Sequence, residues 1–125
     1  MSYNIASTVA PQLALCSFSS SGAGNVAFSF INGDFTPTIA SDIITLDAGF
    51  EYFVVSTPTI SVATTYKHII DGVDQTSYTV TATSTTSGLD ENTSSIQADA
   101  SVAFSLYADQ AVTSNSRLQL WRFSL

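Results

Sequence analysis

Apolar and hydroxyl-bearing residues alternate over short segments along much of the chain. From residue 77 to 83 every second residue is apolar, namely Tyr78, Val80 and Ala82, and all the others are serine or threonine. A period of two is typical of a β-strand with one buried face, because successive side chains of a strand point to opposite sides. We therefore predict a strand here whose outer face is coated with hydroxyl groups.

Seven other segments also suit an extended chain, which makes about eight strands at the spacing of a sandwich or barrel. The predicted strands cover residues 12–18, 25–31, 43–46, 52–57, 66–70, 77–83, 101–107 and 117–125. Turn-forming residues separate them, at 20–24, 32–34, 47–49 and the strong hairpin signal Asp71-Gly72, and longer polar loops are predicted at 85–92 and 109–116. No window has the apolar spacing of a capped helix. The prediction is an all-β, antiparallel β-sandwich in a single domain, residues 1–125.

The last predicted strand is apolar on both faces. Leu118 and Leu120 share one face, whereas Trp121, Phe123 and Leu125 share the other. A strand that is apolar on both faces is usually buried on both faces. One of its faces is therefore expected to fill the core, and the other needs a second cover.

The strand that begins at Tyr52 has the same property, with Tyr52 and Val54 opposite Phe53 and Val55. No helix is predicted that could cover a second apolar face in a two-layer domain. We therefore expect another copy of the same sheet to cover it, which predicts an oligomer. A tightly curled monomeric barrel is the alternative.

The composition excludes several classes of partner. The formal net charge is −7, because three lysines and arginines face ten acids, and 20 serines and 16 threonines supply most of the polarity. Three cations cannot neutralise a row of phosphates, which argues against nucleic acid and against anionic lipid as partners. No apolar run is long enough to span a membrane, and no signal peptide is recognisable. The chain is expected to be made in, and first released into, a cytosol.

No group of residues has the spacing of a catalytic or metal site. His68 is the only histidine and lies within a predicted strand, and no serine stands in a strained Gly-x-Ser-x-Gly turn. Cys16 is the only cysteine, so it forms no disulfide within the chain and is expected to be a packed small hydrophobe. Small groups of acids occur in turns: Asp71 with Asp74, and Asp90 with Glu91. Neither group has the spacing of a calcium loop, so we predict no enzyme, no cofactor and no metal.

Two aromatic residues and one arginine are candidates for binding. Phe35 and Tyr107 lie near strand ends and are candidate glycan contacts, because an exposed ring can stack on a sugar, although packing is the alternative. Arg122 falls on the Leu118 and Leu120 face of the last strand. An interior guanidinium needs a carboxylate or carbonyl partner, so an ion pair is predicted there, either between strands or between subunits.

Three segments within residues 43–125 resemble a known family. Residues 44–56 (ITLDAGFEYFVVS) resemble the apolar-Thr-Leu-x-x-Gly corner and aromatic inner strand of trimeric jelly-roll knobs. Residues 66–72 (YKHIIDG) resemble the strand and turn that follow, and residues 116–125 (SRLQLWRFSL) resemble the closing strand at the threefold axis. Such knobs include tumour-necrosis-factor-like domains, complement globular heads, bacteriophage fibre tips and virion decoration proteins. Residues 1–42 do not match.

The resemblance implies a jelly roll of about eight to ten strands that assembles as a homotrimer. The residues expected at the oligomer interface are Tyr52, Val54, Phe104, Leu118, Leu120, Trp121, Arg122, Phe123 and Leu125. The implied function is a non-enzymatic structural protein on the virion surface, a knob that decorates or cements a phage capsid. Its partners would be its own copies and the major capsid protein or another virion protein. The alternative is a fibre-tip or lectin-like knob that binds a host-surface glycan or receptor. Residues 1–24 are expected to hold the first strand and an anchoring arm.

Overall fold

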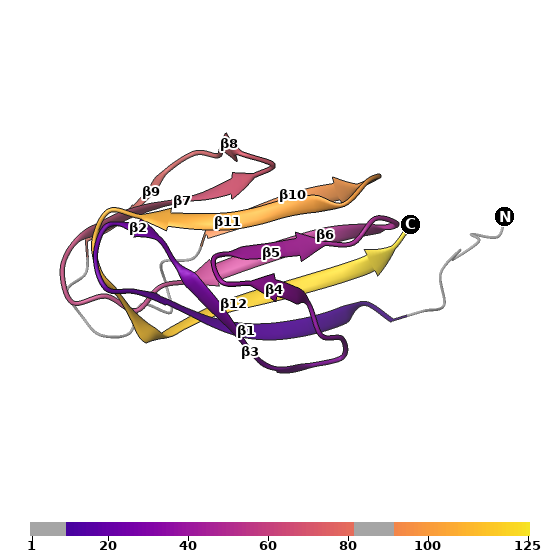
Figure 1. Cartoon of the computed structure of the whole chain (residues 1–125), viewed down its shortest axis with the longest axis horizontal. Coiled ribbons are helices and arrows are strands. Elements are labelled where there is room, and N and C mark those ends of the chain that lie inside the picture. Colours follow the sequence, from indigo (N-terminus) through magenta and orange to yellow (C-terminus); the bar gives the residue numbers. More distant parts are fainter. Residues whose placement is uncertain (1–9, 82–91) are drawn as a thin grey trace, which may run out of the picture.

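The computed structural model describes residues 10–81 and 92–125, and these residues form twelve β-strands and no helix. Figure 1 shows the strands in sequence order. They are β1 (Gln12–Ser20), β2 (Gly24–Asn25), β3 (Ala27–Gly33), β4 (Thr38–Ala40), β5 (Ile43–Leu46), β6 (Phe50–Thr57), β7 (Thr64–Ile70), β8 (Val73–Asp74), β9 (Tyr78–Val80), β10 (Asn92–Ala98), β11 (Val102–Ala108) and β12 (Val112–Ser124). The all-β prediction is confirmed. The structure has slightly more strands than expected, because it contains several very short strands in addition to the long ones.

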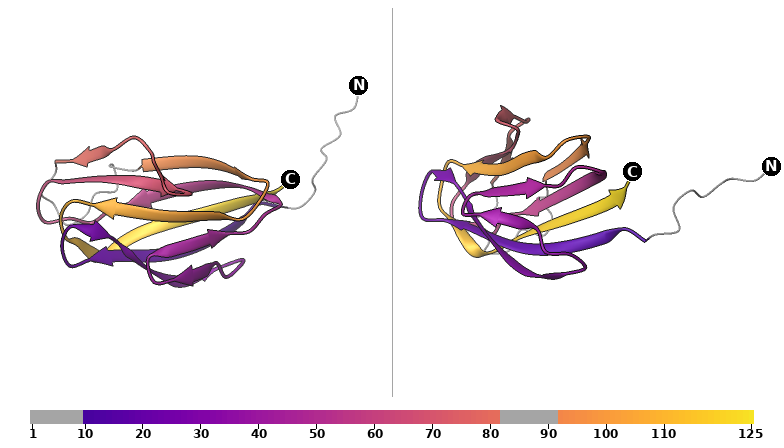
Figure 2. Two further views of the ribbon diagram at one scale, coloured as in Figure 1. Left: turned by 45° about the horizontal axis from the view of Figure 1, so that its top comes forward. Right: turned by 45° about the vertical axis from the view of Figure 1, so that its right-hand side comes forward.

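The strands form two antiparallel sheets that pack face to face (Figure 1). One sheet has five strands in the order β10-β6-β12-β1-β3. The other has seven, in the order β4-β5-β11-β7-β8, with β2 paired to β11 and β9 paired to β7. The first and last long strands, β1 and β12, lie side by side, as the indigo and yellow ribbons of Figure 2 show. From β5 onwards the chain passes repeatedly between the two sheets, which is the connectivity of a jelly roll.

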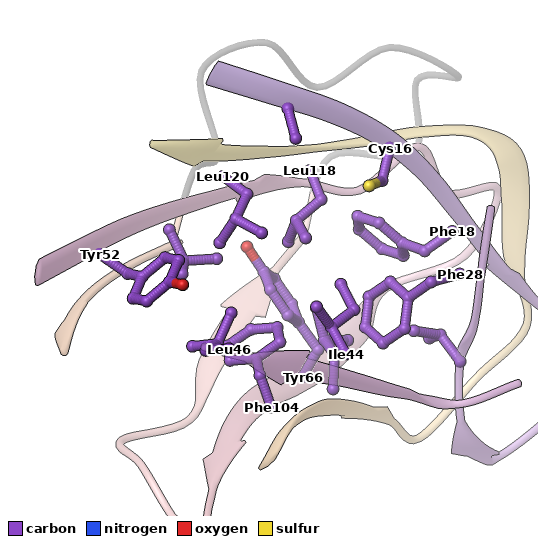
Figure 3. Close-up of a cluster of buried hydrophobic side chains, with 14 of the residues drawn as sticks. Cys16, Phe18, Phe28, Ile44, Leu46, Tyr52, Tyr66, Phe104, Leu118 and Leu120 are labelled. Atoms are coloured by element: carbon purple, nitrogen blue, oxygen red, sulfur yellow. The ribbon is translucent and has the colours of Figure 1, made fainter. Parts of the chain in front are cut away.

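The core lies between the sheets and is built from alternate residues of the facing strands. Phe18, Leu118 and Leu120 point inward from the five-stranded sheet, and Tyr66 and Phe104 point inward from the other (Figure 3). Each of these side chains is at most 1% exposed. Complete burial of an apolar side chain of this size contributes about 1.5–3 kcal/mol, so this layer holds the two sheets together.

One predicted strand is in fact two strands in different sheets. The segment 25–31 breaks at Val26: β2 pairs with β11, whereas β3 pairs with β1. The Val26 side chain is fully buried, and its N–H donates to the Leu106 carbonyl at 2.9 Å. The alternation of apolar residues does not reveal this change of sheet, because both halves of the segment are extended.

Two further differences from the predicted strands concern the C-terminal third. Strand β10 was not predicted, because its sequence NTSSIQA offers only two apolar residues, Ile96 and Ala98, to the core. The predicted loop 109–116 is wrong from residue 112 onward, where the chain already belongs to the thirteen-residue strand β12. The buried Val112 and Ser116 face the core there. The predicted loop 85–92 lies outside the described residues up to 91.

The predicted Asp71-Gly72 turn joins β7 to β8. Asp71 has φ 50° and Gly72 has φ 78°, so both central residues occupy the left-handed region that a tight type I′ hairpin requires. Glycine reaches this region without steric cost, and aspartate tolerates it better than most residues. The hairpin prediction is therefore confirmed.

Asp71 also ends the pairing of β7 with β11. Its N–H donates to the Ala103 carbonyl at 2.8 Å, and its carboxylate accepts the Ala103 N–H at 2.8 Å. The side chain thus replaces one backbone carbonyl of the ladder. Two other aspartates make the same reciprocal pair with a neighbouring strand: Asp34 with Leu13, and Asp109 with Thr65. These carboxylates are therefore structural caps of the sheets, a role that the sequence did not suggest.

Candidate oligomer interface

Five of the nine predicted interface residues lie inside a single chain. Tyr52, Val54, Phe104, Leu118 and Leu120 are at most 1% exposed, because they fill the space between the two sheets. This corrects the expectation that they contact another copy. A period of two separates the two faces of each strand, but it does not say which face turns inward.

The opposite faces of the same strands lie on the outside of the five-stranded sheet. Leu13 of β1 is paired with Trp121 of β12, and Trp121 is paired with Phe53 of β6, so the three side chains form one row across the sheet. Phe53 is 38% exposed, and Leu13 and Trp121 are partly buried. Two aromatic rings and one leucine side chain in a single row form a contiguous apolar surface rather than a set of scattered apolar residues.

Further apolar residues extend this row in both directions along the strands. Leu15 and Val55 occupy the next row, on either side of Gln119, and Val55 is only 7% exposed. Phe123 lies beyond the first row in the opposite direction and is 42% exposed. We call the six apolar residues the outer patch: Leu13, Leu15, Phe53, Val55, Trp121 and Phe123. The outer patch includes two predicted interface residues, Trp121 and Phe123. The predicted interface residue Leu125 follows β12 and is largely exposed.

The outer patch has almost no charge within it. Three charges flank it: Glu51, paired with Phe123 at one end, Arg117, paired with Thr57 at the other, and Asp34, whose carboxylate accepts the Leu13 N–H at 3.0 Å. Gln119 lies between the rows and accepts a hydrogen bond from the Trp121 indole N–H at 3.2 Å. An apolar centre with charges confined to the margin is the usual anatomy of a protein interface.

Arg122 lies between two aromatic rings at the end of the sandwich. Its guanidinium carbon is 3.8 Å from the centroid of Phe35 and 4.2 Å from that of Phe50. Its Nε donates to the Gln12 side-chain oxygen at 2.7 Å, and Nη1 is 4.0 Å from the Asp47 carboxylate. The predicted ion pair is therefore present within one chain. The guanidinium covers one face of Phe35, so less of this partly buried ring is open to a sugar than its assignment as a glycan contact assumes.

Replacement of Arg122 by methionine is expected to lower the free energy of unfolding by about 1–2 kcal/mol, because two partly desolvated cation–π contacts are lost. Arg122→Lys should recover only part of this loss, since an ammonium group cannot stack flat between Phe35 and Phe50. Urea denaturation of the three proteins measures the difference. Equal midpoints for the wild type and Arg122→Met would contradict a stabilising role for the stack.

His68 joins the two sheets through a buried chain of hydrogen bonds. Its Nε2 lies 2.6 Å from the Ser56 hydroxyl of β6, and its Nδ1 lies 2.7 Å from the Ser94 hydroxyl of β10. The ring is 0% exposed, and its aromatic neighbours are Tyr66 and Phe104. Burial lowers the pKa of His68 to about 4, so the imidazole is neutral at pH 7. None of these contacts is with a carboxylate, so the arrangement differs from a catalytic triad.

Cys16 and the acidic groups occupy structural positions. Cys16 is buried in the core, and burial raises the pKa of its thiol to about 11, which disfavours the reactive thiolate. Asp74 pairs with Lys67 at 2.6 Å. Across residues 10–81 and 92–125, no three histidine, cysteine or acidic side chains are grouped as ligands of a metal ion. The predicted acidic pair Asp90 and Glu91 lies outside these ranges.

Tyr107, the second candidate glycan contact, lies on the outer side of the seven-stranded sheet. It is partly buried and is paired with Lys67 of β7. It is thus separated from the outer patch by the whole thickness of the sandwich.

Comparison with known proteins does not place the chain in a family. No protein-family model matches it, and no curated protein matches it either. In the described part of the chain, no helix has the length and apolar character needed to cross a membrane.

Sequence reasoning missed four residues of the outer patch as interface candidates: Leu13, Leu15, Phe53 and Val55. The alternation at Phe53 and Val55 was visible in the sequence. What the sequence lacked was the strand order β6-β12-β1, which places side chains more than a hundred residues apart in one row.

Proposed function

We propose that this protein is a structural knob of a virus particle, assembled as a homotrimer through the outer patch, that decorates or cements a phage capsid. The observation that carries the proposal is the apolar surface on the outer side of β1, β12 and β6. Those three strands already pair with one another, so their outer faces form one continuous surface.

Exposure of this apolar surface to water costs free energy. Each Å² of apolar surface that copies of the chain cover contributes roughly 25 cal/mol before the costs of association. The patch lacks charge, although the chain carries a formal net charge of −7. Identical chains of this charge repel one another in general, so close approach is least costly where the surface is neutral. Self-association through the outer patch therefore suits this chain better than association through its other faces.

A threefold arrangement and a place on a virion are supported by the jelly roll and by the sequence resemblance. Double-sheet jelly rolls are common among viral capsid domains, although a fold alone does not set a function. The surface polarity rests mainly on hydroxyl groups, and the negative net charge keeps a densely displayed protein soluble. The knob would then act through interface area and would require no catalytic group.

The mass in solution tests the assembly. Light scattering at low micromolar concentration is expected to give three times the chain mass of 13.2 kDa. Phe53→Glu should weaken association at least about 30-fold, because each subunit would bury an unpaired carboxylate in the interface. Val73→Glu is the matched control, because Val73 is also exposed but lies on β8 in the other sheet.

A wild-type monomer or dimer would contradict the trimer, and so would a trimer that withstands Phe53→Glu. The place on a particle needs a separate measurement. Antibodies raised against the purified chain are expected to label the surface of intact virions, and particles that lack the chain are expected to lose their contents at a lower temperature. Particles without label would contradict the virion assignment even if the trimer is found.

A further inference from the structure

A small hollow lies on the outer face of the seven-stranded sheet, where β7 and β11 run side by side. It has a volume of about 90 Å³. Its lining residues are Thr65, Tyr66, Lys67, Ser77, Tyr107 and Asp109. β11 ends there, at the opposite end of the sandwich from the end of β12 (Figure 1). The hollow is therefore distant from the Arg122 stack, and it lies on the opposite sheet from the outer patch.

One side of the hollow is an aromatic ring with a fixed cation. The Lys67 ammonium group is 5.3 Å from the centroid of the Tyr107 ring. Lys67 is held there by Asp74, whose carboxylate lies 2.6 Å from Nζ. The ammonium group covers part of one face of the ring, and the ring as a whole is only partly buried, so its remaining surface is open to a ligand. The ammonium group has three N–H donors, of which Asp74 accepts one.

The other side of the hollow supplies hydrogen-bonding groups. Asp109 uses one carboxylate oxygen to accept the Thr65 N–H at 2.9 Å, and its backbone N–H donates to the Thr65 carbonyl at 3.0 Å. Among the described residues, its second carboxylate oxygen and the exposed Ser77 hydroxyl accept or donate no hydrogen bond. The reciprocal pair with Thr65 fixes the carboxylate, so the second oxygen points in a defined direction.

We propose that this hollow binds one terminal, neutral sugar ring. A pyranose has an apolar C–H face, which packs on an aromatic ring, and hydroxyl groups, which need acceptors and donors around that ring. Tyr107 supplies the ring, the Asp109 carboxylate supplies an acceptor, and Lys67 supplies a donor. The volume of the hollow admits only part of one sugar ring, so the site would bind the terminal residue of a glycan rather than an internal one.

The charges in the hollow select a neutral sugar. The Lys67 charge is already balanced by Asp74, and Asp109 adds a second negative charge at the site. An acidic sugar would bring a third carboxylate close to these two on a chain of formal net charge −7. Carboxylates that lie close together repel one another, so an acidic sugar is disfavoured.

Amide shifts of the ¹⁵N-labelled protein test the proposal. The probes are the methyl glycosides of galactose, glucose and mannose, with N-acetylneuraminic acid as the acidic comparison. At least one neutral glycoside should bind with a Kd of about 1–10 mM, which is usual for so small a ligand. The shifted amides should be those of the residues that line the hollow. No shift with any neutral glycoside, shifts elsewhere, or tighter binding of the acidic sugar would overturn the proposal.

Substitutions in the hollow identify the contacts. Tyr107→Ala is expected to weaken the binding at least about tenfold, whereas Tyr107→Phe keeps the ring and should bind as the wild type does. Asp109→Asn retains an oxygen for the Thr65 N–H but loses the negative charge, so it should also bind more weakly. Ser105→Ala, on the same face of β11, is the control and should change nothing. Wild-type affinity in Tyr107→Ala would overturn the proposal, whatever the mass of the assembly.

Discussion

A chain that ends at Arg117 is expected to be unfolded or aggregated. The deleted residues include the buried Leu118 and Leu120, and they form the part of β12 that lies between β1 and β6. Without them β1 and β3 lose their connection to β6 and β10, so one sheet is divided into two pairs. A protein of this size is stable by only about 5–15 kcal/mol, and the loss of a central strand exceeds that margin.

Circular dichroism and size-exclusion chromatography measure the outcome of this truncation. A chain that ends at Phe123 is the control, because it keeps the core contacts and removes only Ser124 and the largely exposed Leu125. The control should unfold cooperatively, with a modest loss of stability. A truncated chain ending at Arg117 that remained soluble and unfolded cooperatively would contradict the central role of β12.

Stability is expected to fall by about 3 kcal/mol through His68 alone as the pH is lowered from 6.5 to 4. The pKa of His68 is lowered from 6.5 to about 4 by burial, so between these values the unfolded chain binds a proton that the folded chain does not. The stability is therefore fully present above pH 6.5 and decreases as the pH falls toward the folded pKa. The ring contacts of His68 are with Tyr66, Phe104 and two serine hydroxyls, none of which supplies a counter-charge.

The single histidine makes this prediction simple to measure. The ring proton signals of His68 are expected to titrate near pH 4 in the folded protein, and a titration near 6.5 would contradict the buried position. Urea denaturation from pH 4 to 7.5 gives the stability. His68→Phe should be less stable at pH 7.5 by about 1–3 kcal/mol, because Ser56 and Ser94 each lose a buried partner. Its stability should also depend less on pH, since the contribution of the buried imidazole is then absent.

The fold class was predictable because the alternation of apolar and hydroxyl residues survives in most strands. The prediction of individual strands failed where few apolar residues mark a strand, as in β10, and where an extended segment changes sheets, as at Val26. The local pattern of apolar and polar residues reveals neither a strand with so few apolar residues nor a change of sheet within an extended segment. Strand order is a property of the whole chain, and one sequence does not encode it in any local window.

The candidate interface was predictable only in part, for the same reason. That the strand around Trp121 has two apolar faces is visible in the sequence, and the structure places one face in the core and the other on the outer patch. Which face turns inward depends on the closure of the sandwich, so Leu118 and Leu120 were assigned to the wrong surface. The partners of Arg122 followed the expected chemistry, but Phe35 became one of them instead of a free ring.

The pairing of β1 with β12 also has a kinetic consequence. Gln12 and Arg122 are hydrogen-bonded although 110 positions separate them in the sequence. Chains dominated by such distant contacts have a high contact order, and they fold over milliseconds to seconds because large loops must close before the contacts form. During that interval the apolar faces of β1 and β6 lack their central neighbour. Competition between folding and aggregation should therefore be decided by temperature and chain concentration during synthesis, independently of how stable the finished sandwich is.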